Sequence, residues 1–279
     1  MTGAAPLSTG ELQRLSTFLY RETGMLFGEA KRYYIERRLA DRYTATGITD
    51  FATYLGHLRT EAAERETLVN AFTINETYFY REEHQLACLC RSLLPALITT
   101  RRPGDKIRIW SVPCSTGEEA YSIAIWLLEN WRLVDAYNIE IIGSDIDTRA
   151  LEAAREGLYG ERALSRLPPK LRDAYFEPAK RHRRRIIRDL RESVTFTPAN
   201  LIDAASMAAH GIFDVIFCRN VLIYFNDESR LVAAGTLYDR LAPGGFLCLG
   251  HTESMSRISP RFETRRFEDA TVFQRPAAP

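Results

Sequence analysis

The sequence contains no hydrophobic run long enough to cross a membrane. Its 279 residues are 46% hydrophobic and 26% charged, and no apolar stretch approaches the ~20 residues that a membrane-spanning helix needs. The first residues also lack the basic-then-apolar pattern of a signal peptide. We therefore expect a cytoplasmic globular protein that does not insert into a membrane, built as one large domain or two smaller ones.

Paired cysteines, metal-ligand spacings and a strong excess of charge are missing as well. The cysteines are scattered, without a C-x-x-C pair, at Cys88, Cys90, Cys114, Cys218 and Cys248, a pattern typical of reduced thiols. The five histidines show no ligand spacing with one another or with cysteine, so we predict no metal site. A formal net charge of +1 argues against broad nucleic-acid binding.

The glycine-rich G-x-G-x-x-G motif of dinucleotide-binding proteins is also absent. Residues 107–119 instead combine a buried-strand pattern, a break at Ser115-Thr116-Gly117 and a helix that begins at the acidic pair Glu118-Glu119. A strand that turns through small residues into a helix opens a doubly wound sheet, whose ligands bind at the carboxyl ends of the strands. Because the two acids would repel a phosphate, they favour a ligand with a positive centre, such as S-adenosylmethionine, over NAD or ATP.

The first quarter of the chain is predicted to be all-helical. Residues 8–72 carry apolar residues at helical spacing and show no strand pattern. Ser8, with a glutamate three residues later, and Asp50 are helix-start signals, whereas Gly24 and Gly47 are helix-stop signals. We interpret residues 1–80 as a small helical domain.

Strand and helix patterns then alternate through the rest of the chain. The strands are predicted at 107–112, 139–143, 194–197, 213–218 and 246–249, followed by a hairpin over 262–274. This order predicts an α/β fold in which a mostly parallel sheet has an antiparallel edge. We place this domain at 81–279, with Thr148 capping a helix that ends at Glu156, and we interpret about 160–193 as a small inserted subdomain.

Two basic stretches allow more than one interpretation. The second helix carries cations on one side, at Lys31, Arg32, Arg37, Arg38 and Arg42. Such a side is either simply solvated or binds an acidic partner. The insertion contains the run Lys180-Arg181-His182-Arg183-Arg184-Arg185, which suits a basic loop or hairpin. A nucleic-acid patch is the alternative, and the rest of the chain does not support it.

Asp145 is the sharpest general signal of a binding site. It ends the second predicted strand, where an acidic side chain can accept hydrogen bonds from both ribose hydroxyls of an adenosine ligand. NAD sites use the same arrangement, but Pro113 removes an N–H group that could hold a pyrophosphate. The segment 73–81, with three consecutive aromatic residues, is either a packed linker or a loop that lines the pocket.

Several segments together resemble the CheR family of chemoreceptor glutamate methyltransferases. They are Thr73–Arg81, Trp110–Tyr121, Ser144–Tyr159, Phe196–Leu201, Phe213–Phe225 and Gly250–Ser254. The resemblance implies a Rossmann-like class I S-adenosylmethionine-dependent methyltransferase sheet with an N-terminal helical domain and a small inserted subdomain. It also implies methyl transfer from S-adenosyl-L-methionine to receptor glutamates, which yields glutamyl 5-methyl esters and S-adenosyl-L-homocysteine in chemotaxis adaptation.

The resemblance also assigns roles to individual residues. Cofactor contacts are implied for Asn75, Thr77, Arg81, Glu119, Asp145, Asn200, Leu201, Arg219 and Asn220. Tyr224 corresponds to an aromatic residue near the transferred methyl group, and we expect Arg81 to hold the incoming carboxylate. Because a glutamate is already ionised at neutral pH, its methylation needs no general base.

The implied partners are the cytoplasmic helices of methyl-accepting chemotaxis receptors. The basic side of the second helix would steer their acidic segments towards the site. Some family members also bind a peptide tether at the receptor's carboxyl terminus and carry glycines in the relevant loop. Residues 161–193 contain no glycine, so tether binding is doubtful here. Two alternatives stay open: a methyltransferase with a small-molecule substrate, and a non-catalytic regulator that binds the same cofactor.

Overall fold

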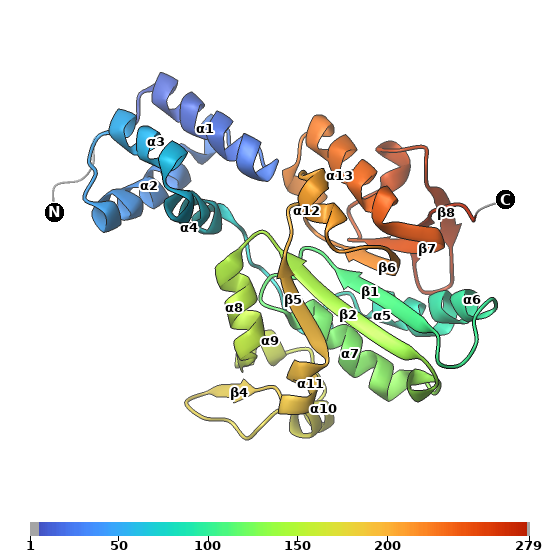
Figure 1. Cartoon of the computed structure of the whole chain (residues 1–279). Helices are drawn as coiled ribbons and strands as arrows, with labels where there is room; N and C mark the ends of the chain where they lie inside the picture. The colour runs from blue at the N-terminus through green and yellow to red at the C-terminus, as the bar shows by residue number, and fades with distance from the viewer. Residues whose placement is uncertain (1–5, 278–279) are drawn as a thin grey trace.

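The computed structural model describes residues 6–277 and begins with a group of four α-helices (Figure 1). These front helices are α1 (Thr9–Thr23), α2 (Arg32–Thr46), α3 (Phe51–Thr60) and α4 (Ala62–Phe72), with a 3-10 turn η1 (Glu29–Lys31) before α2. In Figure 1 they lie together at one end of the molecule, and α4 stands directly above α8 (Thr148–Glu156). The predicted all-helical start of the chain is confirmed.

The predicted helix-end signals act as expected. The Ser8 side chain and the Glu11 side chain form a reciprocal capping box at the start of α1, and the Asp50 carboxylate accepts the Thr53 N–H at the start of α3. α1 and α2 end at Gly24 and Gly47, both in the left-handed conformation that glycine adopts at no steric cost. These local signals therefore determine where the front helices begin and end.

A seven-stranded sheet forms the centre of the α/β part. Its strand order is β5-β2-β1-β6-β7-β9-β8. The strands are β1 (Lys106–Ser111), β2 (Asn138–Asp145), β5 (Val194–Pro198), β6 (Phe213–Cys218), β7 (Leu241–Leu249), β8 (Glu263–Arg266) and β9 (Thr271–Gln274). The first five pair in parallel, whereas β9 pairs antiparallel with both β7 and β8. The predicted parallel sheet with an antiparallel edge is confirmed.

Helices cover both faces of this sheet. Besides α8 and the helices of the insertion, the helical elements of this part are α5 (Glu83–Cys88), the π-helical η2 (Leu89–Leu93), α6 (Leu94–Ile98), α7 (Glu118–Asn130), η3 (Val134–Ala136), α12 (Ala204–Ala208), η4 (Leu222–Tyr224), α13 (Asp227–Arg240) and η5 (Met255–Arg257). One apolar cluster joins α5, α7 and α8 to one face, and a second joins α12 and α13 to the other. No helix within the described residues is both long and apolar enough to cross a membrane.

The second cluster continues from the sheet into the front helices. It includes Trp110 and Ile216 from the sheet together with Leu15, Leu39 and Phe72 from α1, α2 and α4. The contact is reinforced by polar bonds, because the Tyr20 hydroxyl lies 3.2 Å from the Asn226 side chain. The front helices are thus packed onto one face of the sheet near its carboxyl ends.

The inserted residues form their own small layer below α8 (Figure 1). Its elements are β3 (Leu158–Gly160), α9 (Glu161–Leu164), α10 (Pro169–Tyr175), β4 (Arg183–Arg185) and α11 (Arg188–Glu192). β3 and β4 pair antiparallel, and a tight turn between Lys180 and Arg183 precedes β4. Arg181 and His182 in that turn both have positive φ, so the basic run forms a turn and a strand.

Two details of the predicted elements are wrong. The residue that caps α8 is Asp147, whose carboxylate accepts the N–H groups of Arg149 and Ala150; the Thr148 hydroxyl is bonded to Glu66 of α4 instead. β7 begins at Leu241, several residues before the predicted Phe246. Its early residues can join the sheet because the pairing with β6 shifts register between Phe213 and Val215.

Gly117, which begins α7, provides a test of this local geometry. Its φ is +93°, and a Cβ atom there would lie 2.9 Å from the Ala154 Cβ. We expect Gly117→Ala to lower the free energy of unfolding by about 2–4 kcal/mol, through backbone strain and overpacking. Gly56→Ala is the control, because a Cβ atom added to Gly56 in α3 would have no neighbouring atom within 4 Å, and it should be neutral or stabilising by roughly 0.5–1 kcal/mol. Equal urea-unfolding curves for the two variants would contradict this account.

Candidate active site

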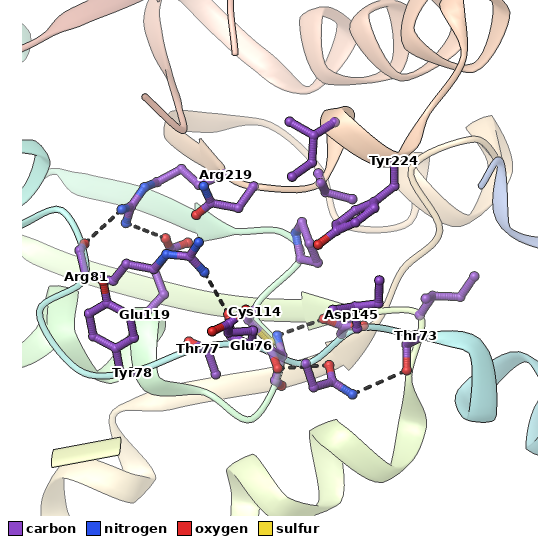
Figure 2. Close-up of a pocket in the computed structure, with 18 of the residues that line it drawn as sticks. Thr73, Glu76, Thr77, Tyr78, Arg81, Cys114, Glu119, Asp145, Arg219 and Tyr224 are labelled. Carbon is purple, nitrogen blue, oxygen red and sulfur yellow. Dashed lines mark hydrogen bonds and ion pairs between the residues drawn. The ribbon is translucent and has the colours of Figure 1, made fainter. Parts of the chain in front are cut away.

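A cavity lies at the carboxyl ends of β1, β2 and β6, under the loop that follows α4 (Figure 2). Its lining comes from four stretches: 73–81 after α4, 113–122 after β1, 145–146 after β2 and 219–224 after β6. Met25 and Leu86 complete it. The segment 73–81 is therefore a pocket-lining loop. The predicted site residues Asn75, Thr77, Arg81, Glu119, Asp145, Arg219, Asn220 and Tyr224 all line this cavity.

The two acids at the start of α7 point to different environments. Glu119 lines the cavity, and its carboxylate accepts bonds from the Ser111 hydroxyl at 2.7 Å and from Arg219 at 2.7 Å. Glu118 is 4% exposed and bonds the Thr116 hydroxyl, and its burial raises its pKa. Since adjacent helix residues point about 100° apart, only one acid of the pair faces the cavity, and it is Glu119.

Asp145 is a buried carboxylate at the end of β2. It is 4% exposed, and its two oxygens accept the backbone N–H groups of Ser115 at 2.7 Å and of Asp147 at 2.9 Å. Burial outweighs these bonds and raises the pKa of Asp145 to about 6, and the neighbouring Asp147 carboxylate adds to the rise. A polar ligand with hydroxyl donors would find in Asp145 an acceptor that is already fixed in position.

Arg219 fills the space between two carboxylates. Its guanidinium lies 2.7 Å from the Glu119 carboxylate and 3.2 Å from that of Glu82, and it donates to the Arg81 carbonyl at 2.8 Å. The arginine side chain is only 3% exposed. Burial opposes its charge, yet the two carboxylates prevail and raise the pKa of Arg219. Glu82 was not predicted as a site residue. Its contact with Arg219 depends on a left-handed backbone conformation (φ 53°), which no sequence pattern indicates for a glutamate.

Asn220 also owes its position to a residue that sequence reasoning missed. The Glu253 carboxylate accepts four backbone N–H groups, those of Gly250, Asn220, Val221 and Leu222. These bonds tie the turn after β6 to the turn after β7 and hold Asn220 at φ 59°. Glu253 lies within the segment Gly250–Ser254 that resembles the CheR family, but the resemblance does not indicate that its carboxylate binds four backbone N–H groups.

The loop 73–81 places a second guanidinium over the cavity. Arg81 donates to the Glu76 carbonyl at 2.7 Å, and its guanidinium lies 5.8 Å from the centre of the Tyr78 ring. Figure 2 shows Arg81 and Tyr78 on the same side of the cavity as Glu119, with Tyr224 opposite. The Lys31 ammonium lies 5.9 Å from the centre of the Tyr224 ring. Cations from the loop and from the front helices thus approach the cavity that the strand-end acids line.

Asn200 and Leu201 are not brought to this cavity. The Asn200 amide donates to the Glu22 carbonyl of α1 at 2.8 Å, and the Leu201 carbonyl accepts the Thr236 hydroxyl at 2.8 Å. Both residues follow β5 at the edge of the parallel strands, where the chain turns to meet the front helices. In this structure they join α1 and α13 to the sheet.

Two of the five cations on the basic side of α2 are paired with carboxylates of the same protein, so this side is not wholly available to an acidic partner. Arg32 pairs with Glu29 at 2.6 Å and with Glu36 at 3.3 Å. Arg42 pairs with the nearly buried Glu64 at 2.6 Å, and its own side chain is 19% exposed. Local carboxylates therefore neutralise these two cations, which makes them poor candidates for steering a partner.

The other three cations of this basic side, Lys31 at the end of η1 and Arg37 and Arg38 of α2, remain available. Lys31 and Arg37 are exposed, and neither has a carboxylate partner within the described part of the chain. Arg38 stacks on Tyr34, with its guanidinium carbon 3.4 Å from the ring centre, and donates to the Ala71 carbonyl. Arg38 and Tyr34 line a shallow groove that runs past Thr73–Thr77 to Gly160–Ala163. This groove borders the cavity.

Comparisons with known proteins agree with this arrangement. Residues 10–73 match the family model "CheR methyltransferase, all-alpha domain", and residues 75–270 match "CheR methyltransferase, SAM binding domain". The chain is 44% identical to chemotaxis protein methyltransferase 2 of Vibrio cholerae, covering 94% of this chain and 92% of that one. It is 34% identical to the chemotaxis protein methyltransferase of Escherichia coli, covering 95% and 91%.

The doubly wound sheet with its acid-lined strand ends thus defines an S-adenosylmethionine-dependent methyltransferase of class I. Within that class, the chain belongs to the CheR methyltransferase family.

The buried Asp145 predicts a pH effect on stability. Its pKa is about 6 in the folded protein against an ordinary 3.8, so between these values the folded state binds more protons than the unfolded state. Stability therefore falls as pH rises through this window, and above pH 6 the ionised carboxylate carries the full penalty, up to about 3 kcal/mol. We expect the Asp145→Asn variant to gain in free energy of unfolding, relative to wild type, as pH rises from 4 to 7.

Urea unfolding of both cofactor-free proteins at several pH values measures this difference. Asp135→Asn, at an exposed position, is the control for removing one acidic group. A difference between Asp145→Asn and wild type that does not change with pH would contradict the burial of an ionised carboxylate.

Proposed function

We propose that this protein is a protein-glutamate O-methyltransferase that modifies chemoreceptors. It transfers a methyl group from S-adenosyl-L-methionine to a glutamate side chain and releases a glutamyl 5-methyl ester and S-adenosyl-L-homocysteine. The observation that carries this proposal is that one cavity combines carboxylates with cations at its rim. Glu119 and Asp145 supply the acids of this cavity, whereas Arg81 of the covering loop and Lys31, beside Tyr224, bring cations to its rim.

The chemistry of the residues in the cavity fits this cofactor. The carboxylate of Asp145 suits the ribose hydroxyls, and that of Glu119 suits an ammonium group. Thr77, Arg219 and Asn220 supply the polar walls between them. When bound, the cofactor supplies an electrophilic methyl group on a positively charged sulfur. Contact of Asn200 and Leu201 with adenine stays a prediction.

Orientation and desolvation are the main tasks of the protein in this reaction. The accepting carboxylate is ionised at neutral pH and attacks in line, so no residue has to remove a proton. Arg81 is suited to hold that carboxylate, because only one of its N–H groups has a partner among residues 6–277 and a guanidinium can donate two parallel bonds to a carboxylate. Tyr224 closes the opposite side and excludes water from the reacting atoms.

The partner proposed for the front helices is the acidic methylation segment of a receptor helix. Lys31, Arg37 and Arg38 are the cations free to steer it, since Arg32 and Arg42 are neutralised within the protein. The insertion presents a basic turn followed by a short strand. Binding of a receptor's C-terminal tether to this insertion is not part of the proposal, because the glycine-rich loop of tether-binding relatives is missing.

Arg81→Ala tests the catalytic assignment. We expect a loss of roughly a hundredfold or more in methyl transfer, since misplaced reacting groups cost that much, with little change in the free energy of unfolding because Arg81 makes few contacts. Transfer of labelled methyl to receptor glutamates, released by base as esters are, gives the activity. Arg91→Ala is the control, because the Arg91 side chain is 72% exposed. Near-normal turnover of Arg81→Ala with cofactor bound would exclude this role.

The same assay separates the alternative functions. A small-molecule methyltransferase would bind the cofactor and leave receptor glutamates unmodified. A non-catalytic regulator would bind the cofactor and transfer no methyl group to any acceptor. Base-labile label on receptor glutamates supports the proposal against both.

Lys31→Glu tests the steering role of α2. We expect the KM for receptor to rise several-fold at low salt, because charge steering acts mainly on encounter. The affinity for S-adenosyl-L-homocysteine should not change. The effect should shrink as salt is raised and the field is screened. Arg59→Glu, an exposed position on α3, is the matched charge reversal. A KM that is equal for the two variants, or independent of salt, would count against steering by α2.

A further inference from the structure

Asp147, at the start of α8, is a buried carboxylate that serves two segments at once. It is 2% exposed. One oxygen, Oδ1, accepts the backbone N–H groups of Arg149 at 3.0 Å and Ala150 at 3.1 Å, which caps the helix. The other oxygen, Oδ2, accepts the Thr73 hydroxyl at 2.5 Å and the Asn75 amide at 2.8 Å. Asp147 therefore binds the loop that covers the cavity.

These bonds are part of a closed ring that includes Asp145. The side-chain amide oxygen of Asn75 accepts the Ser115 hydroxyl at 2.9 Å, and the Ser115 N–H donates to Asp145 at 2.7 Å. The Asp147 N–H donates to the other Asp145 oxygen at 2.9 Å. Figure 2 shows Thr73 and Asp145 at the same end of the cavity, joined through dashed bonds. The ring links the loop, the turn after β1 and the end of β2.

The front helices are fastened at the same place. Asn70 of α4 exchanges bonds with Thr148, donating to its hydroxyl at 2.9 Å and accepting its N–H at 3.3 Å. Because Thr148 follows Asp147 directly, both the end of α4 and the loop after it meet the N-terminus of α8. The position of the loop over the cavity thus depends on this junction.

The function of helix capping does not explain all the bonds of Asp147. Asp203 caps α12 in the same way, with Oδ1 accepting the N–H groups of Ala205 and Ser206, and it binds no loop of the cavity. The Asn75 amide is equally occupied, since both of its ends bond protein groups. Asn75 lines the cavity, and these bonds fix the orientation of its side chain there.

We propose that Asp147 is a positioning residue for the cofactor. Its Oδ2 oxygen sets the loop 73–81 over the cavity, and its N–H sets the Asp145 carboxylate beneath it. Cofactor binding then requires a hydrogen-bond acceptor in the side chain of residue 147 that faces a hydrogen-bond donor in the side chain of residue 75. This inference rests on the cofactor role of the cavity and does not depend on which acceptor receives the methyl group.

Asp147→Asn is the first test. An asparagine can keep the cap, because asparagine is also a good N-cap residue, but its amide N–H would face the Asn75 amide, so the loop loses a bond to a charged acceptor. We expect the Kd for S-adenosyl-L-homocysteine, measured by calorimetry, to rise at least about tenfold. The KM for S-adenosyl-L-methionine should rise with it, and kcat should change much less. Asp203→Asn is the matched control and should leave the Kd unchanged.

A reciprocal exchange separates this role from a purely structural one. Asn75→Asp alone places two carboxylates together and should also weaken binding. In the double variant Asp147→Asn/Asn75→Asp, the amide at 147 can donate to the carboxylate at 75. We expect the double variant to recover most of the affinity that each single change loses. A role limited to capping α8 predicts no such recovery.

The outcomes divide cleanly. Wild-type affinity in Asp147→Asn, or a double variant as weak as the weaker single variant, overturns the inference. If Asp147→Asn fails to fold, Thr73→Val/Asn75→Ala removes both loop partners and keeps the cap; unchanged affinity in that variant overturns it as well. Loss and recovery of cofactor affinity in a protein that methylates no receptor glutamate would support the inference and reject the proposed function.

Discussion

The buried ion pairs of Arg219 are the interaction on which the site depends. One guanidinium binds Glu119 at the start of α7, Glu82 before α5 and the Arg81 carbonyl of the covering loop. Removing a charge from water costs several kcal/mol, and the paired carboxylates offset that cost only if all three segments stay in position. The arginine therefore joins the end of β6 to segments 100 and 138 residues away in the chain. Glu119 and Glu82 keep their positions because this cation lies between them.

Charge pairing also decides which parts of the surface can meet a partner. Five cations lie on α2 and at the residue before it, yet Arg32 and Arg42 face carboxylates of the same protein. A cation that is paired with a carboxylate of its own protein produces only a weak electrostatic potential at the surface, so it attracts an acidic helix little. Lys31, beside Tyr224, and Arg38, beside the covering loop, lie next to the cavity instead. The basic surface of α2 is thus narrower than its composition suggests and is adjacent to the site.

The cavity is a product of the contact between the front helices and the sheet. The strand ends supply Asp145 and Glu119, but the loop after α4 supplies the cover, and Asp147 binds both parts. A methyl transfer that needs no proton removal depends chiefly on such relative placement. The front helices and the sheet also share one apolar cluster. This packing holds the covering loop at a fixed position relative to the strand ends.

The sequence by itself determined the elements, because helix caps, strand periodicity and turn residues act over a few neighbours. Ser8 and Asp50 cap helix starts with their side chains, and Gly24 ends α1 in the left-handed conformation. Asp145 ends its strand at the cavity. The CheR resemblance supplied most of the remaining site residues. Only the tertiary structure decided how Glu82, Glu253 and Asp147 are used, which cations of α2 are free, and that Asn200 faces α1. Each of these depends on a partner distant in the chain, and no local pattern encodes the direction of a side chain towards it.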